Sequence, residues 1–289
     1  MKRLLLYIIM YISFLPFCSC YRDFQIETED FTPHIVMYSL VQADSLIHFT
    51  LSRSWLSGNK PEDISLKKAN VSLFVNGEQK DPAITIPRSG DHLRLAIEVE
   101  GMPTAYAETV VPQKVEIDTV RYIWNDKSQF NMQIEVTFKD TAGRDDYYGL
   151  GLYGNSQYNY SEIFSVDTHQ EPLFSYLREL GVLDDMVGSE KFYYVGNLIP
   201  FSGQSIDGQT YTLRVTLRKH LWDNLDNVLI CLYSFSPSYY TYLLSLLRIG
   251  INVLSDFGLA DPNLIYKNVE NGLGIFGACQ LDTVHISLK

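Results

Sequence analysis

The sequence predicts a mainly β protein, in which an N-terminal β-sandwich of immunoglobulin or transthyretin type precedes a larger β-rich domain with one or two packed helices. Three observations predict this class. Apolar and polar residues alternate with a period of two over many short segments, as in half-buried strands. Asn76-Gly77 is a strong signal for a tight hairpin, because both residues tolerate positive φ. Only two segments have the apolar spacing of a helix.

The first 32 residues are expected to direct export rather than to fold with the rest. Residues 1–19 combine a basic head, an apolar run and small residues, which is typical of a secretory signal rather than a membrane-spanning helix. Ser19 before Cys20 resembles the cleavage site of a bacterial lipoprotein, in which the Cys20 thiol is acylated. The alternative is an exported soluble protein with an unmodified cysteine. Residues 20–32 are polar and acidic, and we expect an acidic tether there.

Residues 33–113 are expected to form the β-sandwich domain. The expected strands cover residues 47–51, 70–75, 93–99 and 104–111. The second of them runs into the Asn76-Gly77 turn, and Pro112 ends the last. Short strands at this density, without a helical segment between them, favour a small antiparallel sandwich.

Residues 114–289 are expected to form the β-rich C-terminal domain. The expected strands cover residues 130–138, 147–153, 191–198, 211–217, 228–235 and 284–288. The apolar spacing predicts one helix over Pro172–Val187. A second helix is better marked, because Ser236 can cap it, Pro237 suits its first turn and Gly250 can close it.

Composition and motifs exclude several classes of function. The chain has 34 acidic and 23 basic side chains and a net charge of -11, so its surface repels phosphate backbones and no nucleic-acid partner is expected. The six histidines are scattered, and the cysteines lack zinc spacing, so neither a metal nor a cofactor is predicted. The acid pairs Asp145-Asp146 and Asp184-Asp185 are interpreted as solvated turns or helix ends. No catalytic motif is recognised, and the sequence does not predict an enzyme.

Tyrosine and cysteine supply the remaining candidate residues. Tyr153, Tyr158 and Tyr160 lie in a segment rich in glycine and asparagine, and Tyr240 lies on the well-marked helix. Rigid rings with a polar tip suit a partner or ligand surface, although alternate rings could instead face the core of a sheet. Cys231 and Cys279 have apolar neighbours, so we expect either two buried free thiols or a disulfide, which an oxidising compartment would permit.

Four stretches resemble a family of Bacteroidota outer-membrane lipoproteins catalogued as domain-of-unknown-function family forty-two forty-nine. They are residues 262–277 (PNLIYKNVENGLGIFG), 236–243 (SPSYYTYL), 66–73 (LKKANVSL) and 107–112 (AETVVP). In the first stretch, Gly272, Gly274 and Gly277 are expected to allow tight turns between core residues. No lysine and no helix start follow these glycines, as a phosphate-binding loop would require.

The resemblance implies a lipid-anchored protein of the outer membrane, displayed on the cell surface and often encoded beside TonB-dependent receptors. It implies a non-enzymatic accessory role, in which the protein partners such a β-barrel in ligand capture or uptake. The alternative is a free-standing adhesin that binds glycans or peptides without a transporter. The family brings no catalytic residues with it.

Overall fold

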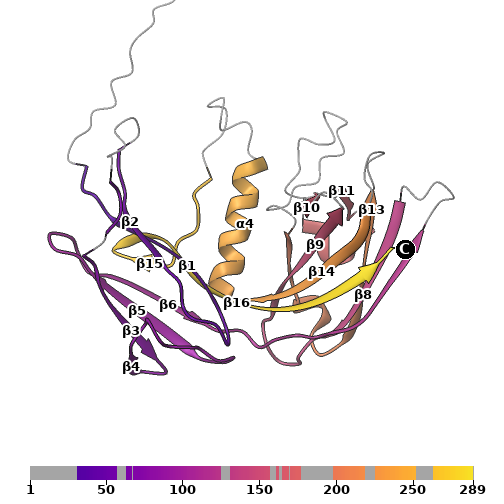
Figure 1. Cartoon of the computed structure of the whole chain (residues 1–289), viewed down its shortest axis with the longest axis horizontal. Helices are drawn as coiled ribbons and strands as arrows, with labels where there is room; N and C mark the ends of the chain where they lie inside the picture. The colour runs from indigo at the N-terminus through magenta and orange to yellow at the C-terminus, as the bar shows by residue number, and fades with distance from the viewer. Residues whose placement is uncertain are drawn as a thin grey trace, which may run out of the picture. The chain divides into compact units, whose positions relative to one another are not determined.

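The structure is a computed structural model, and it describes residues 31–56, 63–66, 68–124, 131–156, 161–162, 165–168, 170–176, 198–218, 225–251 and 263–288. The chain divides into two compact units, residues 1–32 and 33–289, and the architecture below is that of the second. This unit is mainly β, as predicted, with three sheets and one α-helix among the described residues (Figure 1). The signal segment with Cys20 and nearly all of the tether lie outside the described residues.

The largest sheet has seven strands and runs through the whole unit. Its strands are β1 (Ile35–Gln42), β2 (Thr50–Arg53), β9 (Tyr147–Ser156), β10 (Ser161–Glu162), β12 (Leu198–Ser202), β14 (Leu225–Phe235) and β16 (Gly272–Ser287). Their order is β10-β9-β14-β16-β1-β2, and β12 pairs with β9. The strand β1 joins β16 in parallel, from Ile35 opposite Gly272 to Gln42 opposite Cys279. Strands from the two predicted domains therefore share one sheet.

A five-stranded sheet packs on one end of the large sheet. Its strands are β3 (Asn70–Val75), β4 (Glu78–Lys80), β5 (His92–Glu98), β6 (Ala105–Val110) and β15 (Val269–Glu270). The predicted hairpin joins β3 to β4, with Asn76 at φ 52° and Gly77 at φ 87°. Buried residues of β5 and β6 form one core with residues of β1 and with Phe276 and Ala278 of β16. The first sandwich is thus completed by strands from residues 269–279.

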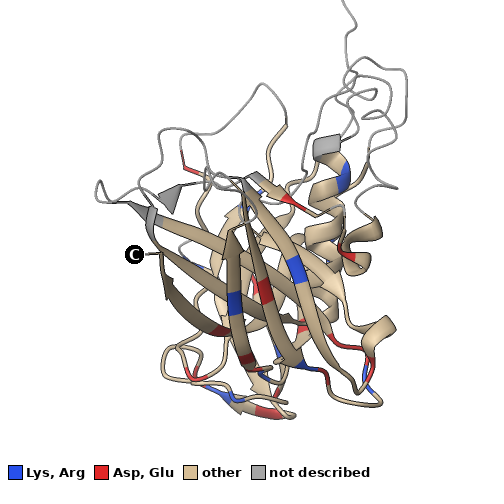
Figure 2. Cartoon of the chain, turned by 90° about the vertical axis from the view of Figure 1, so that its right-hand side faces the viewer, with Lys and Arg blue, Asp and Glu red and all other residues tan. Residues whose placement is uncertain are grey.

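A four-stranded sheet packs on the other end. Its strands are β7 (Ile117–Trp124), β8 (Asn131–Lys139), β11 (Ser165–Asp167) and β13 (Thr210–Arg218). Inward residues of β8 and β13 meet those of β9, β12 and β14 in a second core. On the outward face, Arg121 and Arg214 flank Glu135 in register, and the Arg214 Nε lies 3.0 Å from the Glu135 carboxylate. Figure 2 views the molecule from this side, where charged positions alternate in sign across neighbouring strands.

The helix α4 (Pro237–Ile251) packs on the face of the large sheet opposite the two cores, over β16, β12 and β9 (Figure 1). Ser236 caps it as predicted, since its hydroxyl accepts from the Tyr239 N–H at 3.4 Å and from the Ala278 N–H at 3.0 Å. No helix among the described residues is long and apolar enough to cross a membrane. For the other predicted helix, the described part is the 3₁₀ turn η1 (Pro172–Phe174) and residues 175–176, and its remainder lies outside the described residues.

The glycine-rich stretch does not form the expected tight turns, because Gly272, Gly274 and Gly277 all lie within β16. Each allows a close approach. A Cβ at Gly274 (φ +102°) would lie 1.9 Å from the Met37 carbonyl oxygen, and a Cβ at Gly277 would lie 2.6 Å from Cδ2 of Tyr239. The glycines therefore admit β1 on one side and α4 on the other.

Candidate functional site

A cleft of about 660 Å³ opens beside α4, between the helix, the η1 turn and the end of β12 with the following 3₁₀ turn η2 (Gln204–Ile206). Ten described residues line it: Pro172, Leu173, Ser175, Tyr176, Ser202, Gln204, Ser205, Tyr240, Leu244 and Arg248. The volume lies within the range of small-molecule binding sites. Rings, hydroxyls, an amide and one guanidinium make up its polar and aromatic lining.

One wall of the cleft is a stripe along α4. Tyr240, Leu244 and Arg248 are spaced four residues apart, and residues at this spacing share a helix face. The Tyr240 ring stacks on that of Tyr147 from β9, with centroids 4.5 Å apart and an interplanar angle of 23°. Burial raises the pKa of Tyr240 to about 12, so its hydroxyl is neutral at physiological pH and can donate a hydrogen bond. The stack holds this ring in one orientation.

The opposite wall is held by a buried carboxylate. Glu171, which is 2% exposed, accepts from the Leu173 N–H at 3.2 Å, the Tyr211 hydroxyl at 2.6 Å and the Arg214 N–H at 2.7 Å. These bonds fix the η1 turn against β13. The Tyr176 hydroxyl donates to the Pro200 carbonyl, and burial, with the neighbouring Tyr240 oxygen, raises the pKa of Tyr176. Both tyrosine rings of the cleft are therefore anchored before any ligand arrives.

Arg248 is the only charged residue among those that line the described cleft. It is exposed, and it is also the only charged residue of α4. The Asn263 side-chain amide donates to the Arg248 carbonyl at 3.0 Å, which closes the last turn of the helix. No described residue forms an ion pair or a hydrogen bond with the Arg248 guanidinium. None of its five donors is engaged by a described residue, which suits a contact with a ligand.

The described lining offers groups that are suited to binding. The described lining residues include no carboxylate, histidine or thiol that could act as a base or nucleophile. Within the described part of the chain, no group of three or more histidine, cysteine or acidic side chains could hold a metal ion. The cleft offers contact area, hydrogen bonds and one positive charge.

The predicted tyrosine surface is only partly present as one site. Tyr240 lines the cleft, whereas Tyr153 lies six residues along β9 from Tyr147, roughly 20 Å away along the strand. Tyr153 is half-buried, and its position beside Tyr233 adds to the burial that raises the pKa of Tyr233. The structure thus separates Tyr153 from the Tyr240 cleft. Tyr158 and Tyr160 lie outside the described residues.

Cys231 and Cys279 are both buried and both free in the structure. They lie on paired strands, but Cys231 faces Thr283 and Cys279 faces Phe235. The offset of four residues is roughly 14 Å, and a disulfide requires Cα atoms within about 7 Å. Burial raises the pKa of each thiol to about 11. Cys279 belongs to the core beneath α4, Cys231 lies opposite Gly151 of β9, and neither lines the cleft.

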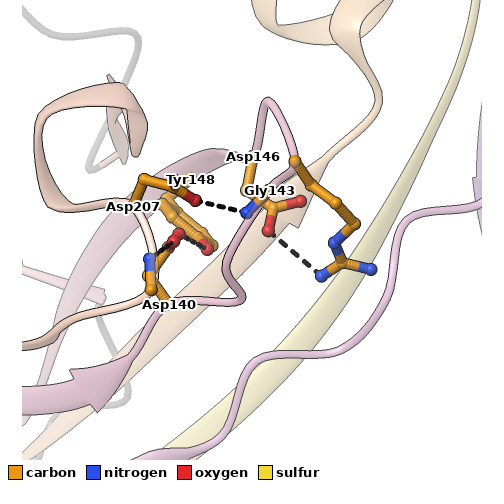
Figure 3. Close-up of polar contacts among 7 residues, drawn as sticks. Asp140, Gly143, Asp146, Tyr148 and Asp207 are labelled. Carbon is orange, nitrogen blue, oxygen red and sulfur yellow. Dashed lines mark hydrogen bonds and ion pairs between the residues drawn. The ribbon is translucent and has the colours of Figure 1, made fainter.

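The acidic turn between β8 and β9 forms hydrogen bonds with the turn that precedes β13 (Figure 3). Asp140, which is 2% exposed, accepts from the Tyr148 hydroxyl at 2.5 Å and from the Gly208 N–H at 2.8 Å. Asp207 accepts from the Gly143 N–H at 2.7 Å. Partial burial raises the pKa of Asp146, which the ion pair with Arg144 at 3.0 Å opposes. These contacts tie the β8–β9 turn to the turn before β13.

Asp145 is exposed, as expected for a solvated turn, and Asp184-Asp185 lie outside the described residues.

Sequence reasoning missed Arg248, Tyr176 and the serines as members of one site. Their elements are far apart in the sequence, so no local pattern links η1, β12 and α4. One signal was present, because Tyr240, Leu244 and Arg248 have the spacing of a single helix face. A positive charge that interrupts an apolar helix stripe, in line with an aromatic residue, would have identified the α4 wall.

No curated protein matches the chain. The family model described as "Domain of unknown function (DUF4249)" matches residues 21–284, which includes the helix, the cleft and the three sheets except the last residues of β16. The chain therefore belongs to the DUF4249 family.

Proposed function

We propose that this protein is a lipid-anchored, non-enzymatic accessory protein on the surface of the outer membrane. It partners a TonB-dependent β-barrel receptor and captures that receptor's ligand. The observation that carries the ligand-binding part is the cleft beside α4. Its described lining has two anchored tyrosine rings, three serine hydroxyls and a guanidinium that no described residue pairs with, and it has no carboxylate, histidine or thiol.

The anchoring part is supported by residues 1–20. A signal segment that ends in Ser19-Cys20 suits acylation of Cys20, and residues 21–32 then provide a short acidic connection to β1. A cysteine that carries several acyl chains is held stably at a membrane. Confinement to one surface raises the effective concentration of two anchored partners, so even a weak contact with a barrel is populated. The DUF4249 membership is compatible with this role and assigns no other.

Affinity purification of the lipidated protein from gently solubilised outer membranes, followed by mass spectrometry, tests the proposal. We expect a TonB-dependent receptor in stoichiometric amount with the wild type, and its loss with Cys20→Ala. Cys231→Ala is the matched control, because it removes a buried thiol and leaves the anchor. If no barrel accompanies the wild type, or if Cys20→Ala retains the barrel in full, the anchored accessory role is wrong.

The second candidate is a free-standing adhesin, and the cleft favours it equally. An adhesin would bind its glycan or peptide without any barrel. One experiment distinguishes the two functions. Capture and uptake of the ligand are measured in cells with and without the receptor that co-purifies. Capture that persists without the receptor indicates an adhesin, whereas capture that requires the receptor indicates an accessory protein.

A further inference from the structure

We infer that the cleft beside α4 recognises an acidic saccharide, with Arg248 binding a carboxylate of the sugar and Tyr240 and Tyr176 contacting sugar rings. The inference rests on the ligand-binding part of the proposed function and is independent of the barrel partner. It combines three features of the cleft: the sign of its charge, the rigidity of its rings and the kind of polar groups beside them.

The charge of the described lining is a single positive one in a protein of net charge -11. The negative end of the helix dipole accounts for a cation in the last turn of α4. It does not account for the position of Arg248 on the cleft stripe, in line with Tyr240 and Leu244. The acids Asp145 and Asp207 line a neighbouring hollow with Arg144, which meets the cleft at Gln204, and neither acid lines the cleft itself. A planar guanidinium that no described residue pairs with matches a carboxylate in two parallel hydrogen bonds.

The rings provide rigid faces at little entropic cost. Tyr240 is held by its stack on Tyr147, and Tyr176 is held by the bond from its hydroxyl to the Pro200 carbonyl. The apolar face of a sugar ring packs against such aromatic faces. An extended apolar peptide would instead be matched by a more apolar groove, and Leu173, Pro172 and Leu244 are the only aliphatic residues among those that line the described cleft.

The remaining lining supplies several short hydrogen-bonding groups. Ser175, Ser202 and Ser205 bring hydroxyls that both donate and accept, and Gln204 brings an exposed amide with both functions. The Ser202 hydroxyl accepts from the Gln204 N–H at 3.2 Å, which orders the start of η2. Sugar hydroxyls also donate and accept, so this set matches a saccharide better than it matches a simple fatty or aromatic acid.

The test uses the intact lipidated protein in detergent on an array that presents acidic glycans beside neutral counterparts. The probes include trigalacturonate with its methyl ester, glucuronate-containing glycans with glucose analogues, and carboxylate-terminated peptides. We expect acidic glycans to bind at least about tenfold more tightly than their neutral counterparts, as the loss of a charge-assisted bidentate contact implies. Equal binding of neutral and acidic glycans, binding of peptides alone, or no binding of acidic glycans would overturn the inference.

Variants then locate the contact. Arg248→Gln is expected to lose at least about tenfold in affinity for the acidic glycan, with little change for the neutral counterpart. Arg121→Gln is the matched control, because it removes the same charge from an exposed position on β7 and is expected to bind as the wild type does. Unchanged binding by Arg248→Gln refutes the site. A barrel that co-purifies while acidic glycans fail to bind would leave the proposed function standing and refute only this inference.

Discussion

The carbonyl oxygen of Met37 on β1 occupies the space that a side chain at Gly274 on β16 would require, 1.9 Å from the position of its Cβ. This contact allows the parallel pairing of β1 with β16, which places β1 in the large sheet where that sheet packs on the five-stranded sheet. Gly274 also has φ +102°, which L side chains rarely adopt. A glycine is therefore required at position 274 for two reasons: the Met37 carbonyl leaves no room for a Cβ, and the backbone has a positive φ.

We expect Gly274→Ala to lower the free energy of unfolding by about 3–5 kcal/mol, because the strand pair must separate or distort. Gly101→Ala is the control, since Gly101 has φ +78° but has nothing within 4 Å of its Cβ position. The control is expected to lose only about 1–2 kcal/mol from the strained conformation. Urea unfolding of both variants checks this, and equal losses would contradict the close approach of β1.

Gly277→Ala tests how α4 sits on the sheet. The new methyl would overlap the Tyr239 side chain, so we expect a loss of about 1–3 kcal/mol in the free energy of unfolding. Tyr239→Ala removes the ring atoms and should relieve part of this overlap. A double-mutant cycle by urea unfolding is expected to give a coupling of at least about 0.5 kcal/mol. Additive effects of the two substitutions would show that the helix does not press on Gly277.

Asn268 fastens the five-stranded sheet to the large sheet through its side chain. Its amide nitrogen donates to the carbonyls of Glu108 and Phe276 at 3.0 and 2.8 Å, and its oxygen accepts from the Phe276 N–H at 2.8 Å. We expect Asn268→Ala to cost about 2–4 kcal/mol in the free energy of unfolding, because three partners lose a bond. Asn70→Ala, which loses one exposed bond to Glu98, is the control and should cost less than about 1 kcal/mol. Similar losses for both, measured by thermal unfolding, would rule out this role for Asn268.

The two buried thiols predict a loss of stability at alkaline pH. Burial raises the pKa of Cys231 and Cys279 from the ordinary value of 9.0 to about 11 in the folded state, so folding favours the neutral thiol. This contribution is fully present below pH 9 and is lost as the pH rises toward about 11. We expect the urea midpoint of the wild type to fall over this window more steeply than that of a Cys231→Ala, Cys279→Ala double variant. Parallel curves would indicate that the thiols titrate normally.

Much of the fold could be predicted because local sequence patterns indicate its strands, its hairpin and the start of its helix. Alternation predicted β5 and β8, Asn76-Gly77 predicted the hairpin, and Ser236-Pro237 predicted the start of α4. The parallel pairing of β1 with β16 could not be predicted, because its partners lie more than two hundred residues apart and nothing local specifies a long-range parallel partner. In sequence, a glycine that leaves room for a neighbouring strand or helix looks the same as a glycine in a turn. Gly272, Gly274 and Gly277 were therefore predicted to form turns, although they lie within β16.

The site was less accessible to prediction than the fold. Tyr240 was identified because it lies on a helix that the sequence marks well, but Tyr176 and Ser202 reach the cleft only through tertiary packing. The role of Glu171 was invisible, since its three bonds come from η1 and from β13, forty residues further on. Sequence predicts which residue types could bind, whereas packing decides which of them meet.

The most direct test of the central claim, that the cleft beside α4 is the binding site, is hydrogen exchange on the intact protein with and without a saturating acidic glycan. We predict slower exchange of backbone amides in residues 172–176, 202–206 and 240–248, which surround the cleft. The strands β3, β4 and β5 of the five-stranded sheet, residues 70–80 and 92–98, should exchange at unchanged rates. Protection confined to those strands, or no protection anywhere, would contradict the account.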